Sequence, residues 1–285
     1  MSFDDSVINY AQADSRLFDE LTSVVDALVR ETGIDPGQIL VVGAGCRDIM
    51  HSALGHPFTL RGTSDTDLGI AVADWTMTKS IERSFPRTGH TGIRYIIEGM
   101  PVDIMPFGEI EDPAGISTPE PRGSEIVVFG FNDVYQNAGR LLLPTGTQIR
   151  IPSVPGYAAL KLRSWIDRSP SGEDKDAKDL AIVTFWYRES QSILNRLYGT
   201  AQGIEVLESV GLDVPLAAAQ LLGADAASQL SPAGRADLIA RWVETPQELL
   251  ARHFTLPPGA SGDFGPERRQ EIVAHLSLGI ANSGS

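Results

Sequence analysis

Two aspartates, Asp65 and Asp67, directly precede an apolar run from Leu68 to Val72. An apolar run that follows a polar turn is typical of a buried β-strand. Side chains at positions i and i+2 of a strand point to the same side, so both carboxylates can face one point. Such a pair suits a hard divalent cation, which completes its shell with water and phosphate oxygens. The alternative from these residues alone is a solvated acidic turn before a strand.

A third aspartate, Asp103, lies within the apolar stretch 102–105, which follows the apolar stretch 93–97 after a four-residue connection. The two stretches predict a pair of strands. A carboxylate inside a strand costs desolvation energy unless a partner compensates it. A metal ion shared with Asp65 and Asp67 would be such a partner. The alternative is an aspartate at a strand end whose side chain reaches water.

The chain upstream of the aspartates predicts a helix, a strand and a second helix. Apolar residues at helical spacing cover 15–32, the unbroken apolar run 39–42 predicts a central strand, and 47–54 predicts a short helix. Gly43 and Gly45 lie between the strand and the second helix. A glycine-containing turn before a helix leaves backbone N–H groups free, and these bind phosphate well. A tight turn without a ligand is the alternative.

The two halves of the sequence differ in character. Residues 1–152 mix strand and helix patterns and contain the segment 107–125, whose prolines and glycines predict an extended loop. Shorter expected elements in this half are a helix at 76–83 and strands at 126–129 and 149–151. Expected helices in the second half cover 155–168, 173–188, 190–198, 202–210, 214–222, 232–242, 245–253 and 266–278. We therefore expect an α/β (α+β) domain with a mixed sheet over 1–152 and a helical domain over 153–285.

Composition excludes several classes of protein. The net charge of -14 argues against a broad basic surface for nucleic acid, because that affinity comes chiefly from Lys and Arg. A single cysteine, Cys46, excludes an internal disulfide and a cysteine-rich zinc site. No apolar run approaches the roughly 18 residues of a membrane span, and the N-terminus lacks the features of a signal peptide. We therefore expect a cytoplasmic protein without a membrane partner.

The first helix of the second half carries a polar stripe. Tyr157, Lys161, Ser164 and Arg168 recur at helical spacing, and the next helix begins in an acidic segment that contains Asp176. Both patterns can also be explained without a ligand. A stripe of Lys and Arg is usually a solvated face, and the helix dipole favours acidic residues in a first turn.

The order of these motifs resembles the nucleotidyltransferases of the DNA polymerase β-like superfamily. In that superfamily a glycine-containing strand-to-helix turn precedes an Asp-x-Asp element, and a third aspartate on a later strand completes the site for metal and nucleoside triphosphate (NTP). The segment 42–48 resembles the Gly-x-x-Arg-Asp head of the tRNA nucleotidyltransferase and poly(A) polymerase branch. The segments 159–168 and 175–180 look more specifically like the AbiEii toxin family, which includes the MenT toxins. The resemblance covers residues 39–185.

The resemblance implies a polymerase β-like core that transfers a nucleoside monophosphate from an NTP to an acceptor hydroxyl. Mg²⁺, with Mn²⁺ as the alternative, would bind Asp65, Asp67 and Asp103, and Asp103 would help to deprotonate the acceptor. Lys161 would contact the triphosphate as one wall of the cleft, and Asp176 would orient Lys161 or contact the base or sugar. Other implied contacts with the nucleotide are those of Gly43, Gly45, Arg47, Ser64 and Arg168.

Three hypotheses about function follow. In the first, the protein is an AbiEii-like toxin that modifies tRNA and is held in check by an antitoxin. In the second, the chemistry is the same but the acceptor is a small molecule or a protein hydroxyl, which the acidic net charge favours. In the third, the protein binds nucleotides without catalysis. Three aspartates count against this last hypothesis, because carboxylates that share a site without a metal repel one another.

Overall fold

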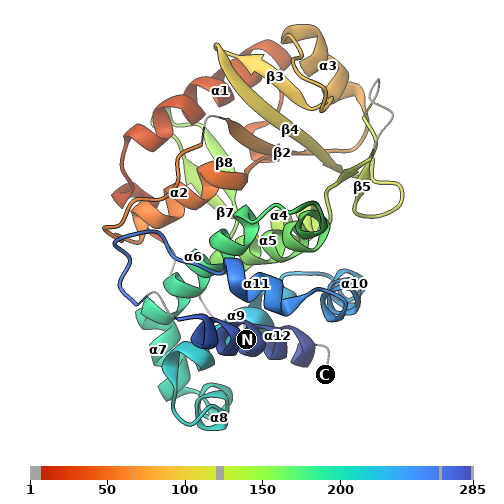
Figure 1. Cartoon of the computed structure of the whole chain (residues 1–285). Coiled ribbons are helices and arrows are strands. Elements are labelled where there is room, and N and C mark those ends of the chain that lie inside the picture. Colours follow the sequence, from red (N-terminus) through yellow and green to blue (C-terminus); the bar gives the residue numbers. More distant parts are fainter. Residues whose placement is uncertain (1–7, 64, 120–124, 263–264, 284–285) are drawn as a thin grey trace. The chain divides into compact units, whose positions relative to one another are not determined.

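The computed structural model describes residues 8–63, 65–119, 125–262 and 265–283 (Figure 1). The fold is mixed α/β with a mixed sheet and C-terminal helices, which confirms the predicted class. The chain divides into two compact units. The sheet unit comprises Asn9–His56 and Leu60–Ser153, and the helical unit comprises the residues from Val154 onward together with Pro57–Thr59.

A mixed β-sheet organises the sheet unit. Within the described residues, six strands form it in the order β3-β4-β2-β1-β8-β7 (Figure 1). Strand β1 is antiparallel to β2 and parallel to β8, and β2 is parallel to β4. The strands are β1 (Ile39–Val41), β2 (Thr66–Val72), β3 (Arg94–Ile97), β4 (Met100–Gly108), β7 (Gly139–Leu142) and β8 (Gln148–Ile151).

The two sides of the sheet differ in polarity. Val102 and Ile104 of β4 are buried, whereas Asp103 and Met105 on the other side are half-buried. Alternate residues of a strand point to opposite sides, so this pattern defines two faces. The side that carries Asp103 is the aspartate face.

Helix α4 (Phe131–Gln136) covers part of the aspartate face. The ring of Phe107, four residues after Asp103 on β4, lies 5.7 Å from the Phe131 ring and 5.6 Å from the Tyr135 ring, between centroids. Gly69 of β2 lies under the same rings, because an added Cβ would come 3.0 Å from Phe107 and 3.1 Å from Phe131. This aromatic cluster holds α4 on the sheet.

Helix α1 (Arg16–Thr32) confirms the predicted amphipathic helix. It buries Phe18, Leu21 and Leu28, and it ends at Gly33, whose φ of 72° is left-handed. Helix α1 contacts α2 (Gly43–Ala53), α3 (Thr76–Ser84) and β3. The apolar side of α1 that the sequence predicted is therefore the side that is buried.

Helix α2 (Gly43–Ala53) begins earlier than predicted. Gly43 and Gly45 were expected in a turn before a helix at 47–54, but both lie in the first helical turn. The change of direction takes place at one residue, Gly43, whose φ is 62°. Because glycine adopts such a φ readily, one residue suffices where a longer turn was expected.

The connection between β3 and β4 is shorter than predicted. Met100 and Pro101 belong to β4, and the turn consists of Glu98 and Gly99 alone. Both turn residues have positive φ, 50° and 80°. Two-residue turns of this kind match the twist of antiparallel strands, so the hairpin closes tightly.

The loop predicted over 107–125 is wrong in part, because it contains a strand. Strand β5 (Ile116–Ser117) pairs with β6 (Ile126–Val127) as a small antiparallel sheet. The sequence also gave no sign of α4 or β7. Both are short, and β7 has one buried residue among four, so neither has the periodicity that identifies an element.

The helical unit consists of consecutive helices, and each of the helices expected after residue 153 is confirmed. They are α5 (Val154–Arg168), α6 (Lys175–Glu189), α7 (Gln191–Gly199), α8 (Ala201–Ser209), α9 (Val214–Ser228), α10 (Pro232–Val243), α11 (Gln247–His253) and α12 (Pro266–Asn282). Short 3₁₀ turns lie at Tyr10–Gln12, Pro36–Gln38 and Ser169–Ser171. In the described part of the chain, none of the helices is both long enough and apolar enough to cross a membrane.

Two glycines let α9 and α12 approach closely. A Cβ added at Gly223 would lie 2.1 Å from the Leu276 carbonyl oxygen, and one at Gly279 would lie 2.0 Å from the Gln220 carbonyl oxygen. Both distances are far below van der Waals contact, and the neighbouring atoms belong to backbone that cannot move aside. The close approach of α9 and α12 therefore depends on the absence of two side chains.

We expect Gly279→Ala to destabilise the protein by about 3 kcal/mol, because the added methyl group must push two helix backbones apart. Urea denaturation followed by circular dichroism measures the change in the free energy of unfolding. Gly199→Ala is the matched control, since a Cβ there meets no atom within 4 Å. Equal stability of the two variants would contradict the packing described above.

Candidate functional site

Asp67 and Asp103 lie side by side on neighbouring strands. Their Cα atoms are register partners in the parallel pair β2 and β4. Cross-strand partners project from the same side of a sheet, so both carboxylates lie on the aspartate face. Asp65 directly precedes β2 and is joined to Asp103 through a shared partner, Arg94. The structure therefore places Asp67 beside Asp103 and links Asp65 to Asp103 through Arg94.

The guanidinium group of Arg94 bridges two of these aspartates. Its Nε and Nη2 donate to the two carboxylate oxygens of Asp103 at 2.8 and 2.7 Å, and Nη2 also donates to Asp65 Oδ2 at 2.7 Å. The Thr63 hydroxyl donates to Asp65 Oδ1 at 2.7 Å. Both oxygens of each carboxylate therefore accept a hydrogen bond from the protein.

The electrostatics of Arg94 follow from this geometry. The hydrogen bonds and charge of Asp103, followed by those of Asp65, raise the pKa of Arg94 above its ordinary value. A bidentate arginine–carboxylate contact is among the stronger charge-assisted hydrogen bonds. A single cation thus holds together two carboxylates that would otherwise repel each other.

Two of the three aspartates, Asp65 and Asp103, converge on a cation that the protein itself provides. Among the described residues, no group of three or more His, Cys, Asp or Glu side chains is arranged to hold a metal ion. The guanidinium of Arg94 stands where Asp65 and Asp103 would bind a shared ion. The donor set, carboxylate oxygens from neighbouring strands, has the chemistry that Mg²⁺ requires. A metal ion at this place would have to replace the contacts of Arg94.

Asp67 lies at the N-terminus of α2. A Cβ added at Gly43 would come within 2.0 Å of Asp67 Oδ2, and the backbone N–H of Val42 donates to the Asp67 carbonyl oxygen at 3.1 Å. The N-terminal end of a helix carries partial positive charge and favours a carboxylate. Glycine is required at position 43 both by its φ and by the carboxylate against it.

The other residues predicted near the phosphates lie in different environments. Gly45 lies in the first turn of α2 and is half-buried. Arg47 is fully buried, and it bonds to Asp48 and to the Arg61 carbonyl oxygen at 2.7 Å. Its guanidinium therefore joins α2 to the segment before β2 and has no exposed surface for a ligand. Ser64 lies outside the described residues.

Lys161 is at the centre of a buried ion-pair network in the helical unit. Its Nζ lies 2.7 Å from Asp179 Oδ2 and 3.0 Å from Asp176 Oδ1, and both carboxylates are fully buried. Arg168 reaches Asp176 Oδ2 at 3.4 Å. The hydroxyl of Tyr157 donates to Asp179 Oδ2 at 3.4 Å. Two cations therefore face two carboxylates between α5 and α6.

This network changes the interpretation of the polar stripe on α5. Tyr157 and Lys161 are buried, whereas the side chain of Arg168 is 43% exposed. Burial acts to lower the pKa of Lys161, but the charges of Asp179 and Asp176 outweigh it and the pKa is raised. Lys161 therefore stays charged and structurally engaged. The prediction that Asp176 orients Lys161 agrees with the 3.0 Å contact, and the predicted contacts of both residues with a nucleotide stay a prediction.

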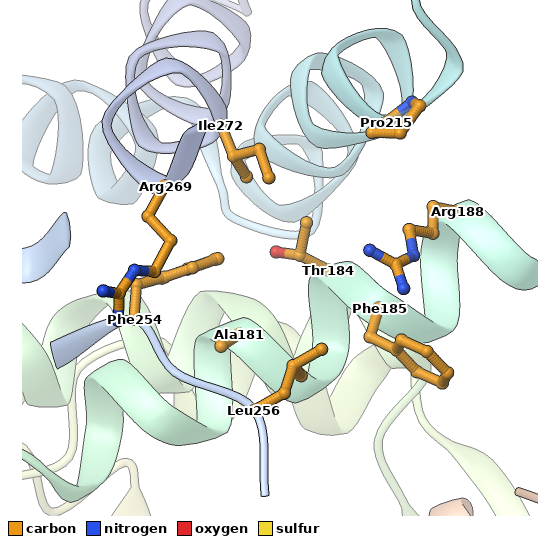
Figure 2. A pocket seen from close by; sticks show the side chains of 9 residues that line it. All are labelled: Ala181, Thr184, Phe185, Arg188, Pro215, Phe254, Leu256, Arg269 and Ile272. Carbon is orange, nitrogen blue, oxygen red and sulfur yellow. The ribbon is translucent and has the colours of Figure 1, made fainter. Parts of the chain in front are cut away.

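A cavity in the helical unit contains none of the predicted site residues. It has a volume of about 20 Å³. Figure 2 shows Arg188 and Arg269 on opposite sides of it, with apolar side chains such as Phe254 and Ile272 between them. A cavity of this size holds one water molecule and is far smaller than a nucleotide site.

Two residues that matter at these places were missed by sequence reasoning. Arg94 was taken as part of a strand and received no role. Because the β3–β4 turn consists of Glu98 and Gly99, residue 94 must face residue 103, and the turn type was the signal that could have found it. Asp179 follows Asp176 by three residues, the spacing that places two side chains on one face of a helix.

Comparison of the chain with protein-family models, with curated proteins and with solved structures finds no match. The candidate site therefore rests on the geometry of this chain's own residues.

We expect Lys161→Ala to destabilise the protein by about 3–5 kcal/mol, because it removes the cation that the buried carboxylates of Asp176 and Asp179 share. Chemical denaturation at pH 7 measures the change in unfolding free energy. Lys178→Ala is the control, since Lys178 pairs with Asp174 at 2.6 Å on the surface, where an ion pair contributes about 0–1 kcal/mol.

The same network sets a dependence on pH. The pKa of Lys161 is raised in the folded state, so its stabilising effect is fully present below the ordinary value of 10.5 and is lost as the pH rises through the folded-state value. The stability difference between wild type and Lys161→Ala should therefore be constant from pH 7 to about pH 10 and shrink above it. A difference that disappears near neutral pH would contradict the buried network.

Proposed function

We propose that the protein is a metal-dependent nucleotidyltransferase of the DNA polymerase β-like type, acting on an RNA acceptor. The observation that carries the proposal is the pairing of Asp67 with Asp103 across β2 and β4, beside the N-terminus of α2. Carboxylates from adjacent strands, next to the N–H groups that begin a helix, can place a metal and a phosphate chain side by side.

The sheet unit supplies the groups that this reaction needs. The N–H groups at the start of α2, around Gly43 and Gly45, would hold the terminal phosphates of the NTP. Asp103 would accept the proton of the acceptor hydroxyl as it attacks the α-phosphate. The attack forms the new phosphodiester bond and breaks the bond between the α- and β-phosphates, and pyrophosphate leaves.

Asp65, Asp67 and Asp103 would hold Mg²⁺. When bound, Mg²⁺ would supply charge neutralisation on the triphosphate oxygens. Arg94 would then release the two carboxylates, and its guanidinium would become available for the anionic substrate that lies beside them. The proposal rests on the sheet unit, and Lys161 and Asp176 stabilise the helical unit.

The acceptor that we favour is RNA, with the end of a tRNA as the first candidate. This preference rests on the motif order, since net charge describes the whole chain and says nothing of one groove. In the same proposal the protein is the toxin of a toxin–antitoxin pair, and an antitoxin protein would restrain it.

A small-molecule or protein hydroxyl is the second candidate acceptor. The net charge of -14 favours it, because long-range attraction to RNA is then weak. Incubation with each radiolabelled NTP and, in parallel, with total RNA, total protein and metabolite extract identifies the acceptor by the fraction that becomes labelled.

We expect Asp67→Asn to reduce nucleotide transfer by orders of magnitude while the melting temperature changes little, because it removes a charged ligand and keeps the shape. Label transferred from NTP at saturating Mg²⁺ is the measurement. Asp19→Asn is the control, since Asp19 is exposed on α1. Transfer by Asp67→Asn within a few fold of wild type would refute the proposed site.

We also expect Arg94→Gln to bind Mn²⁺ at least about tenfold more tightly than wild type, because the competing cation is removed. Isothermal titration calorimetry measures this without any turnover. Arg87→Gln is the matched control, since Arg87 pairs with Glu82. Equal Mn²⁺ affinity in wild type and Arg94→Gln would mean that metal does not bind between Asp65 and Asp103.

A further inference from the structure

A groove of about 630 Å³ lies beside the β7–β8 hairpin of the sheet unit. Two arginines line it, Arg140 on the edge strand β7 and Arg150 on β8. The turn residues Thr145 and Thr147, and Gly37 from the segment before β1, line it as well. The groove is open and polar, which suits a charged ligand rather than an apolar one.

The strand register places both arginines on the aspartate face. Arg140 is the Cα partner of Arg150, and Arg150 is the partner of Leu40. Leu40 is in turn the partner of Gly69, which lies two residues after Asp67 on the same strand. Cross-strand partners and alternate residues share a face, so the arginine pair and the aspartates project from the same side of the sheet. Strand spacings put the Cα atoms of Arg150 and Asp67 about 12 Å apart.

The arginine pair forms no ion pair. Among the described residues, neither Arg140 nor Arg150 pairs with a carboxylate. The carboxylates at the groove bond to other groups: Asp35 accepts a hydrogen bond from the Gly37 amide at 2.9 Å, and Asp26 accepts from the hydroxyls of Thr145 and Thr147 at 3.2 Å each. Like charges directly opposite each other destabilise a pair of strands. In a chain of net charge -14, two adjacent arginines without an ion pair are therefore a focused place for an anion to bind.

The guanidinium group of Arg150 is fixed in position by its neighbours. Its Nη1 donates to the Ala138 carbonyl oxygen at 3.2 Å, and its guanidinium lies 5.5 Å from the centre of the Tyr135 ring. The Tyr135 hydroxyl is fixed by a 2.7 Å hydrogen bond to the Gly37 carbonyl oxygen. Arg140 is exposed, so its guanidinium can move to meet the ligand. One fixed and one mobile arginine can together bind the oxygens of a phosphate group.

We propose that Arg140 and Arg150 bind the phosphodiester backbone of the RNA acceptor, a short distance from its reacting hydroxyl. This inference rests on the proposed function and names the surface that holds its substrate. A protein with little overall attraction for RNA needs such a local contact, and the arginine pair lies on the same face of the sheet as the aspartates, with about 12 Å between the Cα atoms of Arg150 and Asp67. This contact recognises the charge of the RNA backbone and not its base sequence, because phosphates are common to all nucleotides.

The test is RNA binding in the absence of NTP. Fluorescence anisotropy with a labelled tRNA transcript, from about 50 to 200 mM salt, gives the affinity and its salt dependence for wild type, Arg140→Gln and Arg150→Gln. Each variant should bind at least about fivefold more weakly at low salt, and its logarithmic salt slope should flatten by about one. Arg83→Gln removes the same charge from an exposed position on α3 and should bind like wild type.

Arg140→Gln keeps the test valid if Arg150→Gln fails to fold, because Arg140 is exposed. Wild-type affinity in Arg140→Gln, or an equal loss in Arg83→Gln, would overturn the assignment. Self-association of Arg140→Gln without loss of RNA binding would also overturn it, because Arg140 would then only protect the sheet edge. If the wild-type protein binds no RNA but still transfers label from NTP to a small molecule, the proposed RNA surface fails and the transferase proposal stands.

Discussion

The parallel pairing of β2 with β4 is the constraint on which the sheet unit depends. Its register runs from Thr66 and Val102 to Val72 and Gly108 without interruption. It sets Asp67 opposite Asp103, and two residues later it sets Gly69 under the aromatic cluster of α4. A slip of one residue would turn Asp67 to the other face and bury it. The same ladder therefore fixes both the core and the candidate site.

Charge in this protein is compensated locally rather than globally. The net charge is -14, yet Arg94 joins Asp65 and Asp103, and Lys161 joins Asp176 and Asp179. The first group is partly exposed, and under the proposed function its arginine would give way to a metal ion. The second is buried, and removing one of its members would leave a buried charge without compensation. The two groups look alike in sequence, but they differ in their access to solvent.

Sequence periodicity predicted the large elements well and the small ones poorly. Helix α1 and the helices after residue 153 carry apolar stripes several turns long, and the structure confirms them. Helix α4 and strand β7 have six and four residues, so tertiary contacts decide their conformation more than their own pattern does. The start of α2 was misplaced because a single left-handed glycine replaced the expected turn. Sequence also marked the three aspartates but not Arg94, since a cross-strand partner is identified only when the turn is known.

By itself the sequence determined the mixed α/β class, the helical second half and the presence of aspartates at strand positions. These follow from local spacing, which every short segment carries with it. Only the tertiary structure decided that Arg94 lies between two aspartates, that Lys161 is buried rather than exposed on the surface of its helix, and that Arg140 lies beside Arg150. Each of these depends on which segments become neighbours, and that is set by strand register and helix packing between residues far apart in the chain.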